Sequence, residues 1–159
     1  MSCFVRCTLA VVAAGVLLIG YPGACAAQQK AVTGAGHEAS YQYDSPGIRL
    51  EGTLVERKVY GPPGYGETPA KDARATILVL KLSFPISVEP TANADASKTA
   101  NLDPAKNVRE VQLFVSQSRA AVARKLVGQM ITATGTLNES ITASQYTKVW
   151  LQVNTLEPK

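Results

Sequence analysis

Histidine and cysteine are nearly missing from this chain of 159 residues. His37 is the single histidine, and the three cysteines, Cys3, Cys7 and Cys25, all lie close to the N-terminus. Activated nucleophiles need an oriented base beside them, and structural zinc sites use cysteine and histidine ligands. Beyond Cys25 the sequence therefore excludes thiol catalysis, cysteine-type metal sites and disulfide bonds. His37 falls in a polar stretch without periodicity, so we expect no catalytic residue, no metal and no cofactor.

A strong excess of one charge is also missing. The chain has 16 lysines and arginines against 12 acidic residues, and its net charge is only +4. Adjacent basic residues occur only as Arg57-Lys58 and Arg124-Lys125, which is far from a basic patch. Nucleic acid is therefore an unlikely partner.

The longest hydrophobic run, residues 9–20, is too short for a stable transmembrane helix, which needs about 20 apolar residues. Arg6 precedes it, Pro22-Gly23 breaks its helix, and Ala24-Cys25-Ala26 supplies the small residues that a signal peptidase accepts. These features predict a signal peptide over residues 1–26, cleaved between Ala26 and Ala27, and a periplasmic or secreted protein. The alternative is a lipid anchor on Cys25, but Pro22 occupies a position where lipoprotein signals usually carry leucine.

Residues 27–47 are predicted to form a flexible leader, because residues 27–43 are polar and show neither helical nor strand periodicity. Residues 48–159 then form a single domain. Alternating apolar residues predict strands over 48–59, 75–88, 108–115, 130–137 and 149–153. Gly52 marks a bend or bulge in the first of these strands, and Pro85 a bend or an edge in the second.

One helix is expected between the third and fourth strands, starting at Ser116 or Ser118 and ending at Gly128. Residues 91–107 are low in complexity and are interpreted as a mobile insertion. Three strands, one helix and two strands is the element order of the OB barrel. The predicted fold is therefore mainly β with one helix, an OB-like five-stranded barrel (β-β-β-α-β-β).

Several short motifs occur in a characteristic order over residues 48–153. They are Leu50-Glu51-Gly52-Thr53-Leu54, Gly61-Pro62-Pro63-Gly64-Tyr65, Leu80-Lys81-Leu82, Pro85-Ile86-Ser87-Val88, Val111-Gln112-Leu113 and the segment 128–137. In these the chain resembles a bacterial family of exported proteins known only as a domain of unknown function (the one numbered 4431). Members of that family often carry a histidine-rich turn before the last strand, whereas this chain has Ala143-Ser144-Gln145-Tyr146-Thr147 there. The resemblance implies a fold and a compartment but no reaction.

The loop that begins at Gly61 holds the best candidate surface. Pro62 and Pro63 fix the backbone and remove two donors, so no β-ladder runs through them, and Tyr65 is the one large side chain. Tyr60 and Tyr146 also fall in predicted loops. We predict that Tyr60, Pro62, Pro63, Tyr65 and Tyr146 form a binding surface, with packing of Tyr65 on its own barrel as the alternative. Trp150, between apolar neighbours on the last strand, is interpreted as a core residue.

These patterns indicate an exported, non-enzymatic binding module that contacts a protein or envelope ligand through its loops. The alternative is an inhibitor or immunity-type protein that blocks a cell-wall-degrading or secreted effector enzyme. A rigid Gly-Pro-Pro loop would suit either role, because preorganisation limits the ordering cost of binding.

Overall fold

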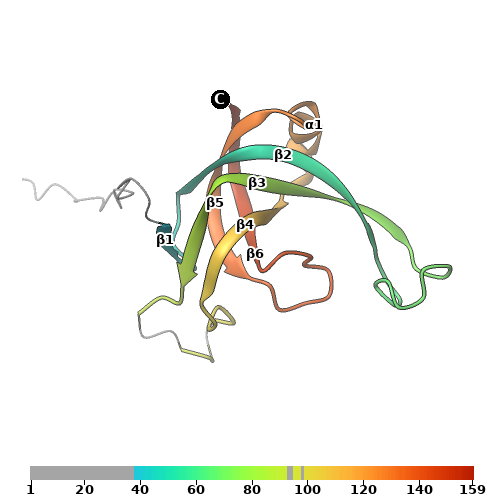
Figure 1. Cartoon of the computed structure of the whole chain (residues 1–159), viewed down its shortest axis with the longest axis horizontal. Coiled ribbons are helices and arrows are strands. Elements are labelled where there is room, and N and C mark those ends of the chain that lie inside the picture. Colours follow the sequence, from blue (N-terminus) through green and yellow to red (C-terminus); the bar gives the residue numbers. More distant parts are fainter. Residues whose placement is uncertain (1–37, 93–94, 98) are drawn as a thin grey trace, which may run out of the picture. The chain divides into compact units, whose positions relative to one another are not determined.

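The computed structural model describes residues 38–92, 95–97 and 99–159 (Figure 1). The predicted signal peptide, all three cysteines and His37 lie outside the described residues. The described part holds six strands and one helix: β1 (Ala39–Gln42), β2 (Ile48–Tyr60), β3 (Arg74–Glu89), β4 (Ala105–Phe114), α1 (Gln117–Lys125), β5 (Met130–Glu139) and β6 (Val149–Pro158).

Strands β2 to β6 close into a five-stranded barrel, which confirms the predicted fold class. The sheet order is β1-β3-β2-β5-β6-β4, and an additional pairing of β3 with β4 closes it. The β4–β6 pair is parallel, whereas the β2–β3, β2–β5, β3–β4 and β5–β6 pairs are antiparallel. This is the topology of the OB barrel, and closure leaves no long free edge on the barrel body.

β2 pairs with two neighbouring strands, and Gly52 lies where the two ladders overlap. Residues 48–53 pair with β5, and residues 52–60 pair with β3. A Cβ atom on Gly52 would lie 2.1 Å from the main-chain oxygen of Lys81, so only glycine fits. The bend predicted at Gly52 follows from this close approach. The β3–β4 register also shifts between Lys81 and Ile86, the segment that contains Pro85.

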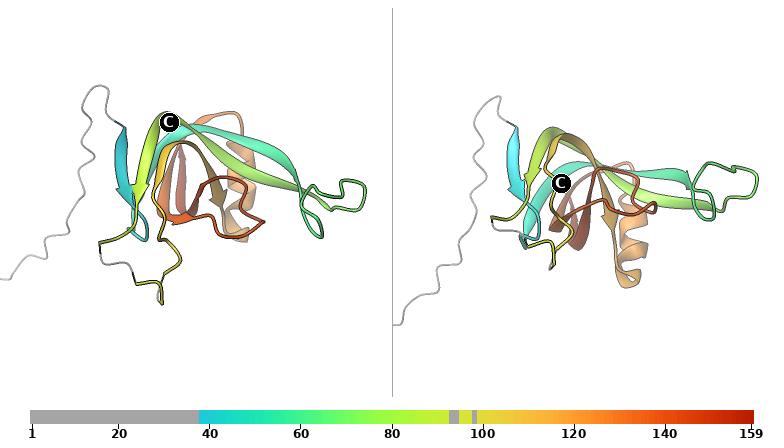
Figure 2. Two further views of the ribbon diagram at one scale, coloured as in Figure 1. Left: turned by 60° about the horizontal axis from the view of Figure 1, so that its bottom comes forward. Right: turned by 90° about the horizontal axis from the view of Figure 1, so that it is seen from below.

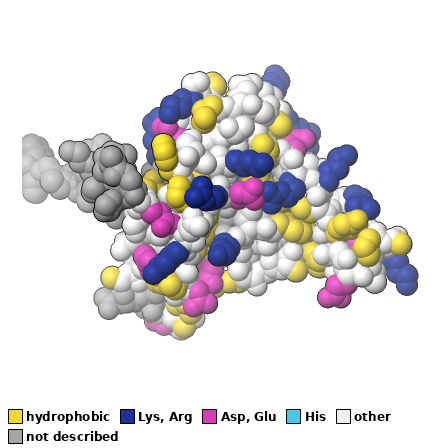
Figure 3. Space-filling model, in the orientation of Figure 1, with side chains coloured by type: hydrophobic (Ala, Val, Ile, Leu, Met, Phe, Trp, Pro, Cys, Tyr) yellow, Lys and Arg dark blue, Asp and Glu magenta, His cyan; other side chains and the backbone are white. Residues whose placement is uncertain are grey.

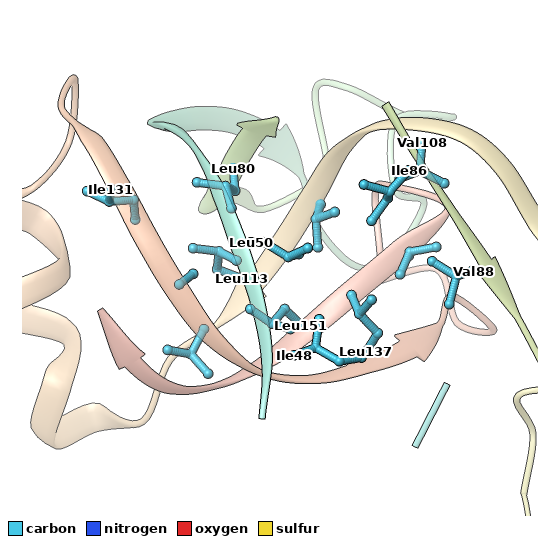
Figure 4. Close-up of a cluster of buried hydrophobic side chains, with 14 of the residues drawn as sticks. Ile48, Leu50, Leu80, Ile86, Val88, Val108, Leu113, Ile131, Leu137 and Leu151 are labelled. Atoms are coloured by element: carbon cyan, nitrogen blue, oxygen red, sulfur yellow. The ribbon is translucent and has the colours of Figure 1, made fainter. Parts of the chain in front are cut away.

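The core fills the inside of the barrel with apolar side chains from all five barrel strands, most of them at alternate positions (Figure 4). Leu54 and Leu80 are cross-strand partners, as are Leu137 and Leu151, and all four are fully buried. Trp150 lies between the buried Val149 and Leu151 and therefore points to the outside, so its assignment to the core was wrong. Its ring packs edge-on against Phe114, with centroids 4.8 Å apart.

The flexible leader predicted for residues 27–47 is wrong from residue 38 onward. β1 adds to β3 in parallel, Tyr43 is completely buried, and Ile48 already belongs to β2. This strand was missed because its four residues alternate too weakly to show a period. Its partner is also more than 40 residues away in sequence, opposite residues 86–89.

The mobile insertion predicted for residues 91–107 is wrong over residues 99–107. β4 begins at Ala105, not at 108, and Ala105 pairs with Val88. Asn101 is buried; its amide nitrogen donates to Asp44 at 2.6 Å, and its amide oxygen accepts from the main-chain N–H of Glu139 at 2.7 Å. This segment is therefore bonded to the barrel.

The predicted helix is confirmed as α1. Ser116 is its N-cap, with extended backbone (φ −60°, ψ 151°) but no capping hydrogen bond from its side chain. Arg124 and Lys125 occupy the last turn, where cations favour the helix dipole, and Gly128 follows at φ +85°. Within the part of the chain that the structure describes, no helix is long and apolar enough to cross a membrane.

A two-stranded ribbon projects from the barrel (Figures 1 and 2). After residue 54, β2 pairs only with β3. Residues 74–77, at the start of β3, pair only with β2. We call residues 55–60 and 74–77, with the loop 61–73 between them, the arm. The arm carries most of the predicted surface at its tip.

Candidate functional site

The loop of the arm is organised around the carboxylate of Asp72. Its oxygens accept hydrogen bonds from the main-chain N–H groups of Gly64 (2.8 Å), Gly66 (2.8 Å) and Thr68 (3.2 Å), and from the Thr68 hydroxyl (3.0 Å). A Cβ on Gly64 would lie 2.7 Å from the Thr68 hydroxyl and 2.8 Å from Asp72, so a larger residue would displace the two side chains that form these bonds. Four hydrogen bonds to one side chain thus connect three residues of the loop to Asp72.

The electrostatics of Asp72 agree with this role. Partial desolvation raises the pKa of the carboxyl group, but the hydrogen bonds from Gly66, Gly64 and Thr68 lower it further than desolvation raises it. The net pKa therefore lies below the ordinary value. Asp72 is thus ionised at neutral pH and acts as an acceptor for the whole loop.

Tyr65 is presented by this loop with its side chain partly in solvent. Its backbone takes the left-handed conformation (φ +49°), its N–H donates to the Gly61 carbonyl at 3.0 Å, and the residue is 40% exposed. Pro62 and Pro63 are exposed beside it and are joined by a cis peptide bond. A left-handed tyrosine is uncommon, and here the surrounding bonds impose it.

Tyr60 is the last residue of β2, not a loop residue as predicted, and an arginine side chain lies over its ring. The guanidinium carbon of Arg74 is 3.8 Å from the centre of the Tyr60 ring, and the two residues are cross-strand partners. This cation–π contact covers the ring and leaves Tyr60 only partly exposed. Tyr60 is therefore partly covered, and Tyr65 is the more exposed of the two tyrosines.

Tyr146 joins a second loop to the arm. Its hydroxyl donates a 2.6 Å hydrogen bond to the carbonyl oxygen of Tyr60, although the two residues are 86 apart in sequence. Burial raises the pKa of Tyr146, and electrostatic interaction with the neighbouring Tyr65 raises it further. Tyr146 is thus hydrogen-bonded to Tyr60 and lies near Tyr65, and we call Tyr60, Tyr65 and Tyr146 the tyrosine cluster.

Gln112 on β4 positions Tyr146. Its side-chain oxygen accepts from the Tyr146 N–H at 2.8 Å, and its amide nitrogen donates to the Ser144 carbonyl at 3.3 Å. Its own main-chain N–H donates to the Thr147 hydroxyl at 2.9 Å. Gln112 is only 3% exposed, so the loop 140–148 is fastened to the outside of the barrel by a buried amide.

The sequence analysis did not find Asp72, Arg74 or Gln112. Asp72 had a local signal, since an aspartate that closes a glycine-rich loop commonly accepts main-chain bonds. Arg74 and Gln112 had none, because their roles depend on a strand register and on a loop that follows much later in the chain.

A shallow depression of about 390 Å³ lies beside Tyr146 on the outside of β4. Its lining includes Arg109, Glu110 and Lys148. Glu110 is bonded to Arg57 across the neighbouring strand at 2.6 Å. Figure 3 shows Lys and Arg side chains, with acidic ones among them, over the face formed by β3 and β4. The surface next to the tyrosine cluster is therefore polar and mixed in charge.

Two further observations bear on the chemistry. Among the residues that the structure describes, no group of three or more His, Cys, Asp or Glu side chains could hold a metal ion. In comparisons with known proteins, no family model matches the chain, and neither a curated protein nor a solved structure is significantly similar to it. The resemblance to the exported domain of unknown function stays a prediction.

Proposed function

We propose that this protein is an exported, non-enzymatic binding module that recognises a protein or envelope ligand through the tyrosine cluster. The observation that carries the proposal is the hydrogen bond from the Tyr146 hydroxyl to the Tyr60 carbonyl. It joins the loop 140–148 to the end of β2, next to the loop 61–73 that carries Tyr65.

Preorganisation supports a binding role. Asp72 holds the arm loop through four hydrogen bonds, and Gln112 holds the loop 140–148 through three. A surface that is already ordered loses little conformational entropy when a ligand binds. Tyrosine adds a large contact area with few rotatable bonds, which is why it is enriched at binding hot spots.

The test replaces Tyr65 by alanine in the exported form of the chain and measures capture of ligand from an envelope extract. We expect Tyr65→Ala to weaken binding by about 1–3 kcal/mol, as for an aromatic hot spot, and to leave the melting temperature nearly unchanged. Phe84→Ala is the matched control, because Phe84 is an aromatic side chain that is 80% exposed and lies outside the arm.

Two results would contradict the proposal. Equal binding by Tyr65→Ala and the original chain would remove Tyr65 from the binding surface. A lowered melting temperature with unchanged binding would show instead that Tyr65 packs against its own domain, because truncating a packed aromatic leaves a cavity.

One observation favours the inhibitor or immunity-type alternative. The arm projects from the barrel, a shape that suits insertion into an enzyme cleft (Figure 1). Its loop exposes Pro62, Pro63 and Tyr65. Inhibition assays of the exported chain against cell-wall-degrading enzymes test this alternative. Loss of enzyme activity that depends on Tyr65 would favour it over simple ligand recognition.

A further inference from the structure

The arm leaves one edge of β3 without a partner strand. The ladder between β3 and β4 ends at the pair of Leu78 and Leu113, whereas the ladder between β3 and β2 continues to Arg74. Residues 74–77 therefore have one edge bonded to β2 and one edge that no described strand covers.

The hydrogen-bond pattern identifies which groups lie on that free edge. The Gly61 N–H donates to the Ala73 carbonyl at 2.7 Å, and the Leu54 N–H points the other way, to the Gln129 carbonyl at 3.0 Å. Along an antiparallel strand, successive residues direct their main-chain groups to opposite sides. The main-chain groups of Ala75 and Ile77 therefore face β2, and those of Arg74 and Thr76 face the free edge.

A groove of about 500 Å³ runs beside this edge, between β3, the end of β4 and α1. Ile77 and Leu78 line it from β3, Phe114 and Val115 from the end of β4, and Ala120 from the helix. Figure 2 shows α1 beside the near end of the arm, which gives the groove its third wall. Apolar side chains thus lie next to main-chain groups that have no strand partner.

One acidic and one basic residue also line the groove. Glu56 of β2 and Arg124 of α1 line it, and neither forms an ion pair with another residue in the described part of the chain. An extended peptide offers what this site lacks: main-chain donors and acceptors at strand spacing, and alternate side chains that include apolar and charged ones.

We propose that the groove binds an extended segment of a partner protein, which adds to the free edge of β3 as a further strand. Main-chain bonds to Thr76 and Arg74 supply affinity, and apolar side chains on one face of the segment enter the groove. An acidic residue of the segment pairs with Arg124, and a basic one with Glu56. This inference rests on the proposed binding function, and it adds a second contact and a partner class: a protein with an exposed extended segment.

The test uses a phage-displayed library of short linear peptides, selected on the full exported chain. We expect selection of peptides with alternating apolar residues. Ala120→Arg should weaken their binding about tenfold or more, because the new side chain fills the groove. Ala121→Arg is the matched control, since Ala121 is the next residue of the same helix, is exposed and does not line the groove.

Amide hydrogen exchange with a selected peptide locates the binding. Bound peptide should slow exchange at Thr76, whose N–H lies on the free edge, and leave Ala75 unchanged, whose N–H already faces β2. The proposal is overturned if no peptide is selected, if Ala120→Arg binds as well as the original chain, or if exchange at Thr76 does not slow.

A third variant separates this inference from the tyrosine cluster. Tyr65→Ala should bind the selected peptides as well as the original chain does, because Tyr65 does not line the groove. Loss of peptide binding in Tyr65→Ala would assign the peptides to the cluster and count against the groove. Retained binding would support the groove even if envelope capture proves independent of Tyr65.

Discussion

Asp72 is the residue that gives the arm loop its conformation. Its carboxylate is buried, and it accepts bonds from three main-chain N–H groups and one hydroxyl, all within eight residues. Because a single side chain closes the loop, the position of Tyr65 depends on a carboxylate that is not itself part of the tyrosine cluster. Asp72 is therefore a positioning residue for the tyrosine cluster.

Asp72→Asn should lower the melting temperature and weaken ligand capture, because an amide replaces one acceptor oxygen with a donor. The effect should depend on pH. The folded pKa of Asp72 lies below the ordinary value of about 3.9, so the carboxylate stabilises the protein fully above that value. The stabilisation is lost as the pH falls through the lower, folded pKa.

Melting curves recorded from about pH 7 down to about pH 2 measure this dependence. The difference in melting temperature between the original chain and Asp72→Asn should be constant near neutral pH and should shrink at the acidic end. A difference that stays constant to the lowest pH would show that the charge of Asp72 contributes nothing.

Among the elements, β2 is the strand on which barrel closure depends. It pairs with β5 over its first half and with β3 over its second, so it must bend where the two ladders overlap. Gly52 lies at that overlap, and the strand also forms one side of the arm. The same element thus closes the core and presents the candidate surface.

Gly52→Ala should destabilise the protein by about 3 kcal/mol or prevent folding, because the new methyl group would lie 2.1 Å from the Lys81 oxygen. Gly61→Ala is the control, since a Cβ there meets Ala73 only at ordinary contact distances of 3.6 and 3.7 Å. Urea denaturation of both variants measures the free energies of unfolding. Equal stabilities would mean that β2 and β3 separate at little cost.

The segment that enters β4 acts as a second structural element. Asn101 bonds to Asp44 near the start of the domain and to Glu139 at the end of β5. The Glu139 carboxylate in turn accepts from the N–H groups of Leu102 and Asp103 at 2.9 and 3.0 Å. These hydrogen bonds hold the segment 101–103 against Asp44 and the end of β5.

Asn101→Ala should lower the free energy of unfolding by about 1–3 kcal/mol, because it leaves the Glu139 N–H and the Asp44 carboxylate without this partner. Leu102→Ala, at a neighbouring residue that is 40% exposed, should change it by less than about 0.5 kcal/mol. Chemical denaturation of both variants distinguishes them. If Asn101→Ala is as stable as Leu102→Ala, the segment is a connector after all.

At the scale of the whole molecule, stability should come from the barrel core and not from covalent links. The sequence has no cysteine after Cys25, so cleavage after Ala26 would leave a chain without thiols. The buried core and the hydrogen bonds must then stabilise the fold without a covalent link.

Intact-mass measurement of the exported protein should show a chain that begins at Ala27. Thermal unfolding of that form should be identical with and without reductant, because no disulfide remains to be reduced. A lipid-modified Cys25 in the mass spectrum, or a shift of the melting temperature with reductant, would show that the cleavage prediction is wrong.

Sequence patterns by themselves determined the order of β2 to β6 and α1, the β class and the loop that carries Tyr65. Strand alternation, the helix signals around Gln117–Lys125 and the Gly-Pro-Pro turn are local, and local preferences are read from neighbouring residues. The tertiary structure decided the features that depend on partners distant in sequence. These are the pairing of β1 with β3, the hydrogen bond between Asn101 and Glu139, and the hydrogen bond between Tyr146 and Tyr60. The outward direction of Trp150 belongs with the local features, because Val149, Leu151 and Val153 alternate along the sequence and place Trp150 on the other side of the strand.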